Sequence, residues 1–442
     1  SLCRRVSIPM NEKTCMVKRI EKKNRLEMTV DVLVRLFVLS SLLIPTAFVN
    51  KVFFALILLI YAADVLYAKK ITTNFIAPIL ILLVFFVGFC QGMVLGCDAS
   101  LAKQFLLSTM LLFLIYPINH YRVDMRCVVR ADSYLYFLFY IVFLIYGLGT
   151  DMLPTSAVVR SAAQSLGIGP ITAIGKLLYT YGAASMGSRS FFSDSGVMIH
   201  LGSVPFLLVP VGVFADEAFR KTTEKKRKIW DLLLCGFCMV LAFLSTSRAL
   251  MMGILCVIAM SFLYHSGAKT KLWALIAVVV AGISVVAFLL TKSNMFSMEE
   301  SSNSIKMGHI TGYFDFMNIK NVLIGNGLAS EYYSNGAARL LAHTEITLLD
   351  YMRYFGVIPA LLVYALLFFP CVGYKKKEKL FNLQFAIFAV YVFMSLTNPV
   401  LFNSVGVVAI LWYWNGLHKQ SLANNDTSEK ALNESLCSGC RV

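Results

Sequence analysis

NFIAPILILLVFFVGFCQGMV, residues 74–94, is the stretch that decides the fold, because it contains no charged side chain. As an α-helix it would extend about 30 Å, which is the thickness of the hydrocarbon core of a bilayer. Similar apolar runs recur along almost the whole chain. The sequence therefore predicts an all-α, polytopic membrane protein.

The overall composition points to the same class. Of the 442 residues, 58% are hydrophobic and 14% are charged, whereas soluble domains have about 45–50% and about 25%. This balance excludes a disordered chain and a soluble enzyme. About twelve membrane spans are predicted, at residues 31–49, 52–67, 74–94, 103–117, 133–149, 195–214, 230–245, 249–265, 272–291, 347–369, 382–398 and 401–417.

Positive charge orients these spans. The two tails and the loops expected on their side of the membrane hold 28 of the 40 Lys and Arg residues, and cytoplasmic loops carry such an excess. The net charge of +16 is thus a topology signal and not a nucleic-acid footprint. We expect a cytoplasmic basic tail over 1–30, a single transmembrane domain over 31–417, and a cytoplasmic polar tail over 418–442.

The cysteines predict neither a disulfide framework nor a metal site. Only Cys97 of the eleven falls in an outward loop. Cys437 and Cys440 form a lone C-x-x-C, which lacks the second half of a zinc site and is expected to lie in an unstructured tail. The basic head followed by an apolar run predicts a retained first span, with translation starting at Met10 or Met16.

Two outward loops are long, at about 150–194 and 292–346. Loops of this length are uncommon unless they carry function or have their own structure, so the working face is expected outside the cytoplasm. In the second loop, apolar spacing predicts an amphipathic interfacial helix over 304–321, which the Gly-Asn-Gly of 325–327 ends. A short helix is predicted over 337–342.

Basic and acid-base side chains occur in these outward segments. Arg189 ends the first loop, and Arg248 follows the Ser-Thr-Ser of 245–247 between two closely linked spans. An arginine at that depth usually faces a protein interior or an aqueous cavity, although Arg248 could also extend to the interface. Guanidinium groups match the oxygens of phosphate.

The second loop adds Lys306 and His309 on the predicted interfacial helix, and His343 with Glu345 at the mouth of the tenth span. A carboxylate or imidazole there can take a proton from an attacking hydroxyl. Together with the arginines, these side chains suit the transfer of a group from a lipid-linked pyrophosphate at the outer face.

Residues 185–370 resemble the bacterial O-antigen ligase and polysaccharide polymerase superfamily. The similarity comprises RSFFSD at 189–194, STSR at 245–248, the Gly-x-Gly of 325–327 and HTEITLLDYMRYFGVIPAL at 343–361. In that family a catalytic His or acidic residue opens such a helix, and a Gly follows it. Gly356 lies eleven residues after Glu345. Glu345 thereby takes the position of the ligase His, which favours a polymerase.

The resemblance implies a metal-independent, lipid-donor glycosyltransferase with a GT-C-like architecture and no cofactor. It would join undecaprenyl pyrophosphate-linked oligosaccharide repeat units into O-antigen, capsule or exopolysaccharide at the outer face of the bacterial cytoplasmic (inner) membrane. The pyrophosphate would be held by Arg189, Arg248, Lys306 and His309. The catalytic residues implied are Glu345, His343 and Arg248, with Glu345 or His343 deprotonating the acceptor hydroxyl.

Alternatives stay open at this point. One is a ligase that transfers the finished glycan to another acceptor, and the other is a flippase for lipid-linked oligosaccharides. A flippase would show paired halves with internal repeats, and we find no convincing repeat between 1–220 and 221–442. Asp350 and Arg353 are expected to form a structural ion pair. In a transporter, the same two residues would instead act as a proton relay. Expected partners are the lipid-linked oligosaccharide, the bilayer, a chain-length regulator and a flippase, but no nucleic acid.

Overall fold

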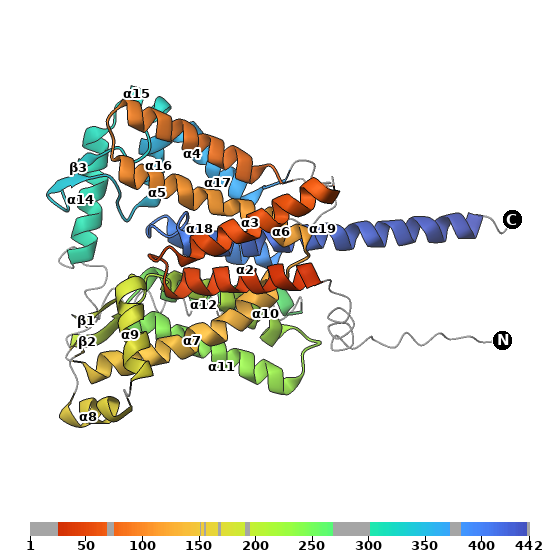
Figure 1. The fold of residues 1–442 in the computed structure, drawn as a ribbon, viewed down its shortest axis with the longest axis horizontal. Coiled ribbons are helices and arrows are strands. Elements are labelled where there is room, and N and C mark those ends of the chain that lie inside the picture. Colours follow the sequence, from red (N-terminus) through yellow and green to blue (C-terminus); the bar gives the residue numbers. More distant parts are fainter. Residues whose placement is uncertain are drawn as a thin grey trace.

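The computed structural model is built almost entirely of helices, with two small hairpins (Figure 1). It describes residues 25–68, 75–150, 152–153, 156–166, 169–190, 195–267, 301–371 and 382–439. Within these ranges, five helices are long and apolar enough to cross a membrane: Val49–Tyr67, Ala77–Val94, Ala99–His120, Met125–Gly149 and Arg248–His265. The fold is that of a helical membrane protein, as the composition predicts.

In the N-terminal part, helices overlap each of the first five predicted spans, although their bounds differ from the predicted ones. Its helices are α2 (Arg25–Leu43), α3 (Val49–Ala68), α4 (Ala77–Val94), α5 (Ala99–Met110), the 3₁₀ turn η1 (Leu111–Leu114), α6 (Ile115–His120) and α7 (Met125–Gly149). Asp98 begins α5 by accepting hydrogen bonds from the backbone N–H groups of Ser100 and Leu101. Asp124 begins α7 in the same way. Such caps satisfy donors that have no partner within the helix.

The first long predicted loop has its own structure. It forms α8 (Ala157–Leu166), α9 (Pro170–Tyr181) and strand β1 (Ser185–Ser190), which pairs antiparallel with β2 (Ser195–His200). The predicted span at 195–214 is therefore wrong in its first part. Helix begins only at η2 (Val204–Leu207), where Pro205 sits in the first turn, because proline is tolerated there but not inside a helix.

Three helices complete this half of the molecule. They are α10 (Leu208–Phe219), α11 (Lys225–Leu244) and α12 (Arg248–His265), and α10 packs against both α11 and α12. The predicted spans at 230–245 and 249–265 correspond to α11 and α12. The span predicted at 272–291 lies outside the described residues.

The second long predicted loop folds differently from the prediction. Its interfacial helix is two helices, α14 (Ser301–Phe316) and α15 (Ile319–Ile324), because Asn318 caps a new helix by accepting from the backbone N–H of Asn321. The short helix predicted over 337–342 is wrong. Residues Arg339–Leu341 form strand β4, which pairs with β3 (Tyr332–Ser334).

The predicted span at 347–369 is broken into α16 (Thr347–Phe355) and α17 (Val357–Phe368). Gly356 separates them with a φ of +83°, a conformation that favours glycine. A Cβ atom at this position would lie 2.3 Å from the backbone oxygen of Leu323. The break therefore depends on glycine and on the close approach of the end of α15.

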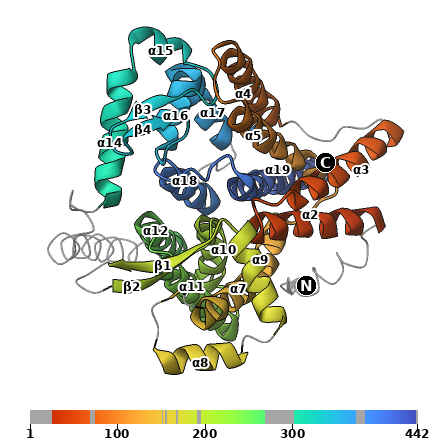
Figure 2. The same cartoon turned by 60° about the vertical axis from the view of Figure 1, so that its left-hand side comes forward.

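Helix α19 (Ser404–Gly439) occupies the centre of the molecule and packs against α2, α6, α7 and α18 (Leu383–Ser395) (Figures 1 and 2). From Val405 to Trp414, each side chain in the core is at most 4% exposed, as expected for a helix that is apolar all round. The helix continues to Gly439. The prediction of an unstructured tail is therefore wrong for 418–439.

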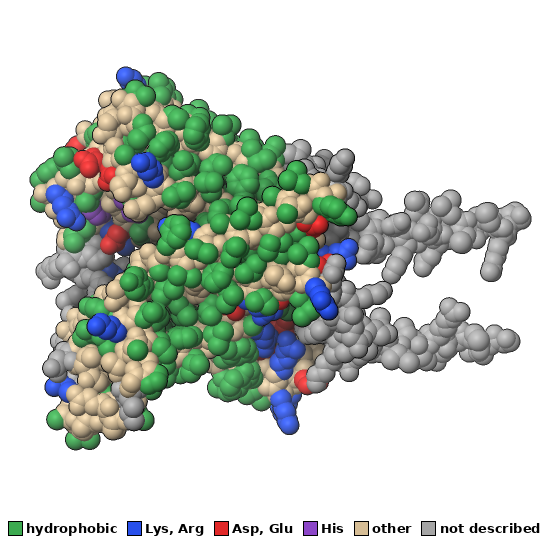
Figure 3. Space-filling model, in the orientation of Figure 1, with side chains coloured by type: hydrophobic (Ala, Val, Ile, Leu, Met, Phe, Trp, Pro, Cys, Tyr) green, Lys and Arg blue, Asp and Glu red, His purple; other side chains and the backbone are tan. Residues whose placement is uncertain are grey.

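The surface is divided into an apolar flank and two charged ends. Figure 3 shows hydrophobic side chains covering the flank, with Lys, Arg, Asp and Glu mostly near the two ends. Among the exposed apolar side chains, Leu59, Leu66 and Val94 are 66%, 78% and 86% exposed. Lipid is the solvent that makes such exposure favourable. Elements α8, α9, β1, β2, α14 and β3 share one end, and α19 extends from the other (Figure 1).

Candidate functional site

The second connecting segment is fixed to the helices by a set of close backbone contacts. A Cβ atom on Gly325 would lie 2.6 Å from the backbone N of Gly356, and one on Gly327 would lie 2.4 Å from the backbone N of Gly92 in α4. Gly325 and Gly327 both have positive φ. The Gly-x-Gly motif therefore serves here to let the chain pass between α4 and the break at Gly356.

Backbone hydrogen bonds complete this junction. Asn326 N donates to Arg353 O at 2.7 Å, and Gly327 N donates to Tyr354 O at 3.0 Å. These carbonyls belong to the last turn of α16, whose acceptors have no partner within the helix. The end of α16 is thus tied to the loop that leads into the β3–β4 hairpin.

A buried ion pair lies in the same helix. Arg353 and Asp350 are 0% and 1% exposed, and Arg353 Nη2 donates to Asp350 Oδ1 at 2.9 Å. The predicted pair is confirmed. Arg353 also donates to the backbone oxygens of Leu341 and Ala342, and it lies 4.6 Å from the ring centroid of Tyr332. The arginine therefore holds the end of β4 and the residue after it against α16.

The second oxygen of Asp350 faces the segment that precedes α16. Asp350 Oδ2 accepts from Thr344 N at 2.7 Å and from Thr344 Oγ1 at 3.1 Å. The same oxygen lies 3.1 Å from Nδ1 of His343. That nitrogen is buried and makes no hydrogen bond in this geometry. Phe105 of α5 packs edge-on against the imidazole, with centroids 5.2 Å apart.

Glu345 has a more exposed setting than His343. Its Oε2 lies 3.2 Å from Nζ of Lys306 in α14, and the two side chains are 52% and 30% exposed. Exposed ion pairs of this kind contribute about 0–1 kcal/mol to stability. The pair joins α14 to the segment that precedes α16. It places two charges close to the His343–Asp350 contact.

His309 is buried where α14 packs on the β3–β4 hairpin. It is 4% exposed, and its Nδ1 lies 2.6 Å from Oγ of Ser334. Burial lowers the pKa of His309, although the nearby carboxylate of Glu345 opposes the change. Gly308 and Gly312 permit the close approach, because a Cβ on either would meet hairpin backbone at 2.1 and 2.5 Å. In this structure His309 is a packing residue.

The two predicted arginines, Arg189 and Arg248, lie in the first connecting segment and the helices that follow it, not in the segment that carries His343. Arg248 is the first residue of α12, after a turn in which Thr246 has a φ of +55°. Arg189 lies in β1 opposite Gly196, and its side chain lies outside the described residues. Figures 1 and 2 both draw β1 and α14 at the same end of the molecule. Thus Lys306, His309, His343 and Glu345 form one cluster, whereas Arg189 and Arg248 lie in β1 and α12, outside that cluster.

The contact that sequence reasoning missed is the one between His343 and Asp350. The i, i+3 spacing of Asp350 and Arg353 reveals their pairing, but it does not show that the other carboxylate oxygen reaches back seven residues. That contact arises because residues 343–346 turn before the helix begins. Among the described residues, no group of three or more His, Cys, Asp or Glu side chains is arranged to hold a metal ion.

Comparison of the chain with models of known protein families, with curated proteins and with solved structures finds no match. The fold itself defines the class: a helical membrane protein whose long connecting segments form a structured end. The polar cluster described above lies at that end.

Proposed function

We propose that the chain is a polysaccharide polymerase that joins undecaprenyl pyrophosphate-linked oligosaccharide units at the outer face of a bacterial cytoplasmic membrane. The observation that carries this proposal is the contact of His343 with the buried Asp350 at the end formed by the two connecting segments. An imidazole oriented by a carboxylate is a common arrangement for a general base. The proposed topology has twelve spans, with both termini cytoplasmic.

The proposed reaction moves the growing glycan from its carrier to a fresh repeat unit. Nε2 of His343 takes the proton of the acceptor hydroxyl while the acceptor oxygen forms a bond to the anomeric carbon of the glycan. The bond from that carbon to the pyrophosphate oxygen breaks, and undecaprenyl pyrophosphate leaves. Arg248 and Arg189 would stabilise the charge that develops on the leaving group.

His343 is a better base in this scheme than Glu345. Glu345 is paired with Lys306 in an exposed position, so its charge is already balanced and hydrated. His343 has the carboxylate of Asp350 behind Nδ1, which would stabilise the imidazolium that proton transfer creates. Lys306 and Glu345 would then contact polar groups of the entering saccharide.

A ligase is the second candidate, because a His opens the corresponding helix in the ligases of the family that the chain resembles. The two reactions share the donor and the leaving group, and they differ in the acceptor. A polymerase would work with a flippase and a chain-length regulator, whereas a ligase would deliver the product of those proteins.

The test is a gel profile of surface polysaccharide from a strain that lacks the chain and from the same strain carrying it again. Single repeat units on the normal acceptor would support the polymerase. Loss of all attached glycan, with long carrier-linked chains accumulating, would replace it by the ligase. Repeat units trapped on the cytoplasmic leaflet would identify a flippase, and an unchanged profile would reject all three.

A further inference from the structure

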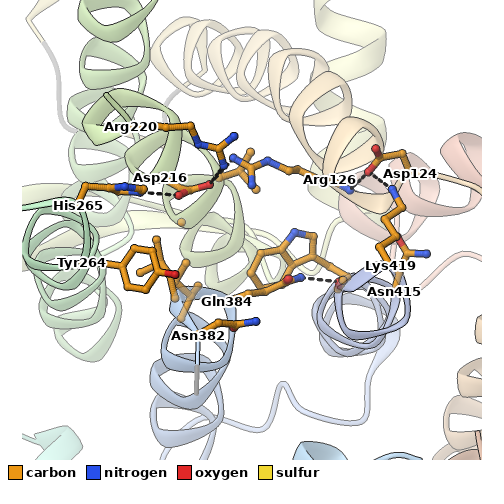
Figure 4. A pocket seen from close by; sticks show the side chains of 16 residues that line it. Asp124, Arg126, Asp216, Arg220, Tyr264, His265, Asn382, Gln384, Asn415 and Lys419 are labelled. Carbon is orange, nitrogen blue, oxygen red and sulfur yellow. Dashed lines mark hydrogen bonds and ion pairs between the residues drawn. The ribbon is translucent and has the colours of Figure 1, made fainter. Parts of the chain in front are cut away.

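A second polar region lies at the far end of α12. Arg248 opens this helix and His265 closes it, so the two residues are about 26 Å apart. Around His265, helices α7, α10, α12, α18 and α19 enclose a cleft of about 360 Å³ (Figure 4). The polar side chains of its lining include Arg126, Arg220, His265, Lys419, Asn415 and Trp412.

The cleft is built around one carboxylate that three basic groups share. Asp216 accepts from Nη2 of Arg126 at 2.5 Å and from Nη2 of Arg220 at 2.8 Å, and His265 Nε2 lies 2.7 Å from its other oxygen. Arg126 also bonds to Glu217 at 3.0 Å. One aspartate therefore does not use all the donors that these side chains carry.

The opposite wall adds another cation. Lys419 of α19 bonds to Asp124 at 2.7 Å, and Figure 4 shows it beside Asn415, across the cleft from Arg220 and His265. The lining holds three permanent positive charges and two negative ones. The lining itself therefore carries one more positive charge than negative charges.

The lining also contains a buried donor without an acceptor among the described residues. Trp412 is 4% exposed, and its Nε1 makes no hydrogen bond. Trp414, two residues later in the same helix, donates from Nε1 to Leu367 O at 2.8 Å. A buried N–H without an acceptor is unfavourable, and Trp412 is one of the residues that line the cleft.

We propose that this cleft binds a phosphate group. Two guanidinium groups, an ammonium, an imidazole and an indole line it, and several donors on different walls match the several oxygens of phosphate. The volume accommodates a phosphate with part of its substituent. The source is either the headgroup of an anionic lipid or a free phosphate compound, and the site is separate from the cluster around His343.

The surface beside the cleft favours the arrival of anions. Residues 220–228 carry six Lys and Arg side chains between α10 and the first turn of α11, and Figure 3 shows basic side chains gathered at that end. A cluster of this size attracts anionic lipid surfaces and dissolved anions. Phosphate would therefore be concentrated at the mouth of the cleft.

The experiment uses the full chain in two arms. In detergent, inorganic phosphate is titrated and the melting temperature is followed; in nanodiscs, retention of phosphatidylglycerol against phosphatidylcholine is measured by native mass spectrometry. The variants are Arg220→Gln and Trp412→Phe, and Lys225→Gln is the control, since it lies in the basic segment but does not line the cleft.

We expect saturable binding that weakens about tenfold in each cleft variant and is unchanged in the control. A response to inorganic phosphate identifies a free phosphate compound as the source, and selective retention of phosphatidylglycerol alone identifies the lipid. Trp412→Phe removes one N–H and keeps the packing, so it decides the matter if Arg220→Gln does not fold. No binding in either arm, or equal binding by wild type and Trp412→Phe, overturns the proposal.

Discussion

Two ion pairs in the same region differ in what surrounds them. Asp350–Arg353 is almost completely buried, and its side chains hold backbone carbonyls and a threonine in place. Lys306–Glu345 joins the same loop to α14, yet both side chains reach solvent. Buried charges without partners are very unfavourable, whereas exposed charges are hydrated. The first pair is therefore expected to govern folding, and the second is available to ligands.

The buried pair should show the largest effect. Replacing Asp350→Asn leaves Arg353 buried without its counter-charge, which should lower the free energy of unfolding by about 3–5 kcal/mol. Thermal unfolding in detergent measures this loss. Glu345→Gln, which breaks the exposed pair, is the matched comparison and should change stability by at most about 1 kcal/mol. Equal losses in the two variants would remove the distinction between the pairs.

The next effect concerns the glycine that breaks the helix beside the buried pair. Gly356→Ala forces a side chain into a left-handed conformation and against Leu323 O, so we expect a loss of about 3 kcal/mol. Gly236→Ala in α11 is the control, because a Cβ there meets nothing within 4 Å. That control should be neutral or more stable by about 0.5–1 kcal/mol. A stable Gly356→Ala protein would mean that α16 and α17 can form one helix.

Protonation of His309 should have a smaller effect. Burial lowers the pKa of His309 in the folded protein, so the unfolded chain binds the proton more readily than the folded one. Stability is then present at neutral pH and falls as the pH drops through about 6.5 towards the folded value. Melting temperatures between pH 7.5 and 5 should show this loss, and His309→Gln should reduce it. An unchanged pH dependence in that variant would contradict the burial of the imidazole.

The exposed pair should show the smallest effect. Lys306→Gln should change the melting temperature only slightly at low salt, and the difference from wild type should vanish near 1 M salt because the pair is screened. A difference that persists at high salt would show that Lys306 is less hydrated than its exposure indicates. Lys320→Ala, on the exposed surface of α15, serves as the control for charge removal.

The sequence predicts the long helices well, since their signal is local. Residues 74–94 and 249–265 are apolar over a spanning length, and α4 and α12 form there. The break at Gly356 and the strand β2 depend on distant contacts, which periodicity does not contain. A single glycine in an apolar run does not by itself predict a break. The break at Gly356 is apparent only from its contact with Leu323 in the structure.

The candidate site shows the same division. The Asp350–Arg353 pair follows from spacing along one helix, whereas Lys306 meets Glu345 only because α14 lies close to the hairpin. Glycines 308 and 312 permit that approach, and their role is invisible until the hairpin is known. The sequence identifies His343 and Glu345 as acid-base candidates. It does not show that Glu345 is more exposed than His343.

We propose that His343, backed by Asp350, is the general base, and that Glu345 is not. The direct measurement is the rate of glycan transfer by the purified chain from a lipid-linked repeat unit. The rates of the His343→Gln and Glu345→Gln variants are compared at equal amounts of folded protein. We predict that His343→Gln lowers the rate about 100-fold or more and that Glu345→Gln stays within about tenfold of wild type. The reverse order would contradict the account and make Glu345 the base.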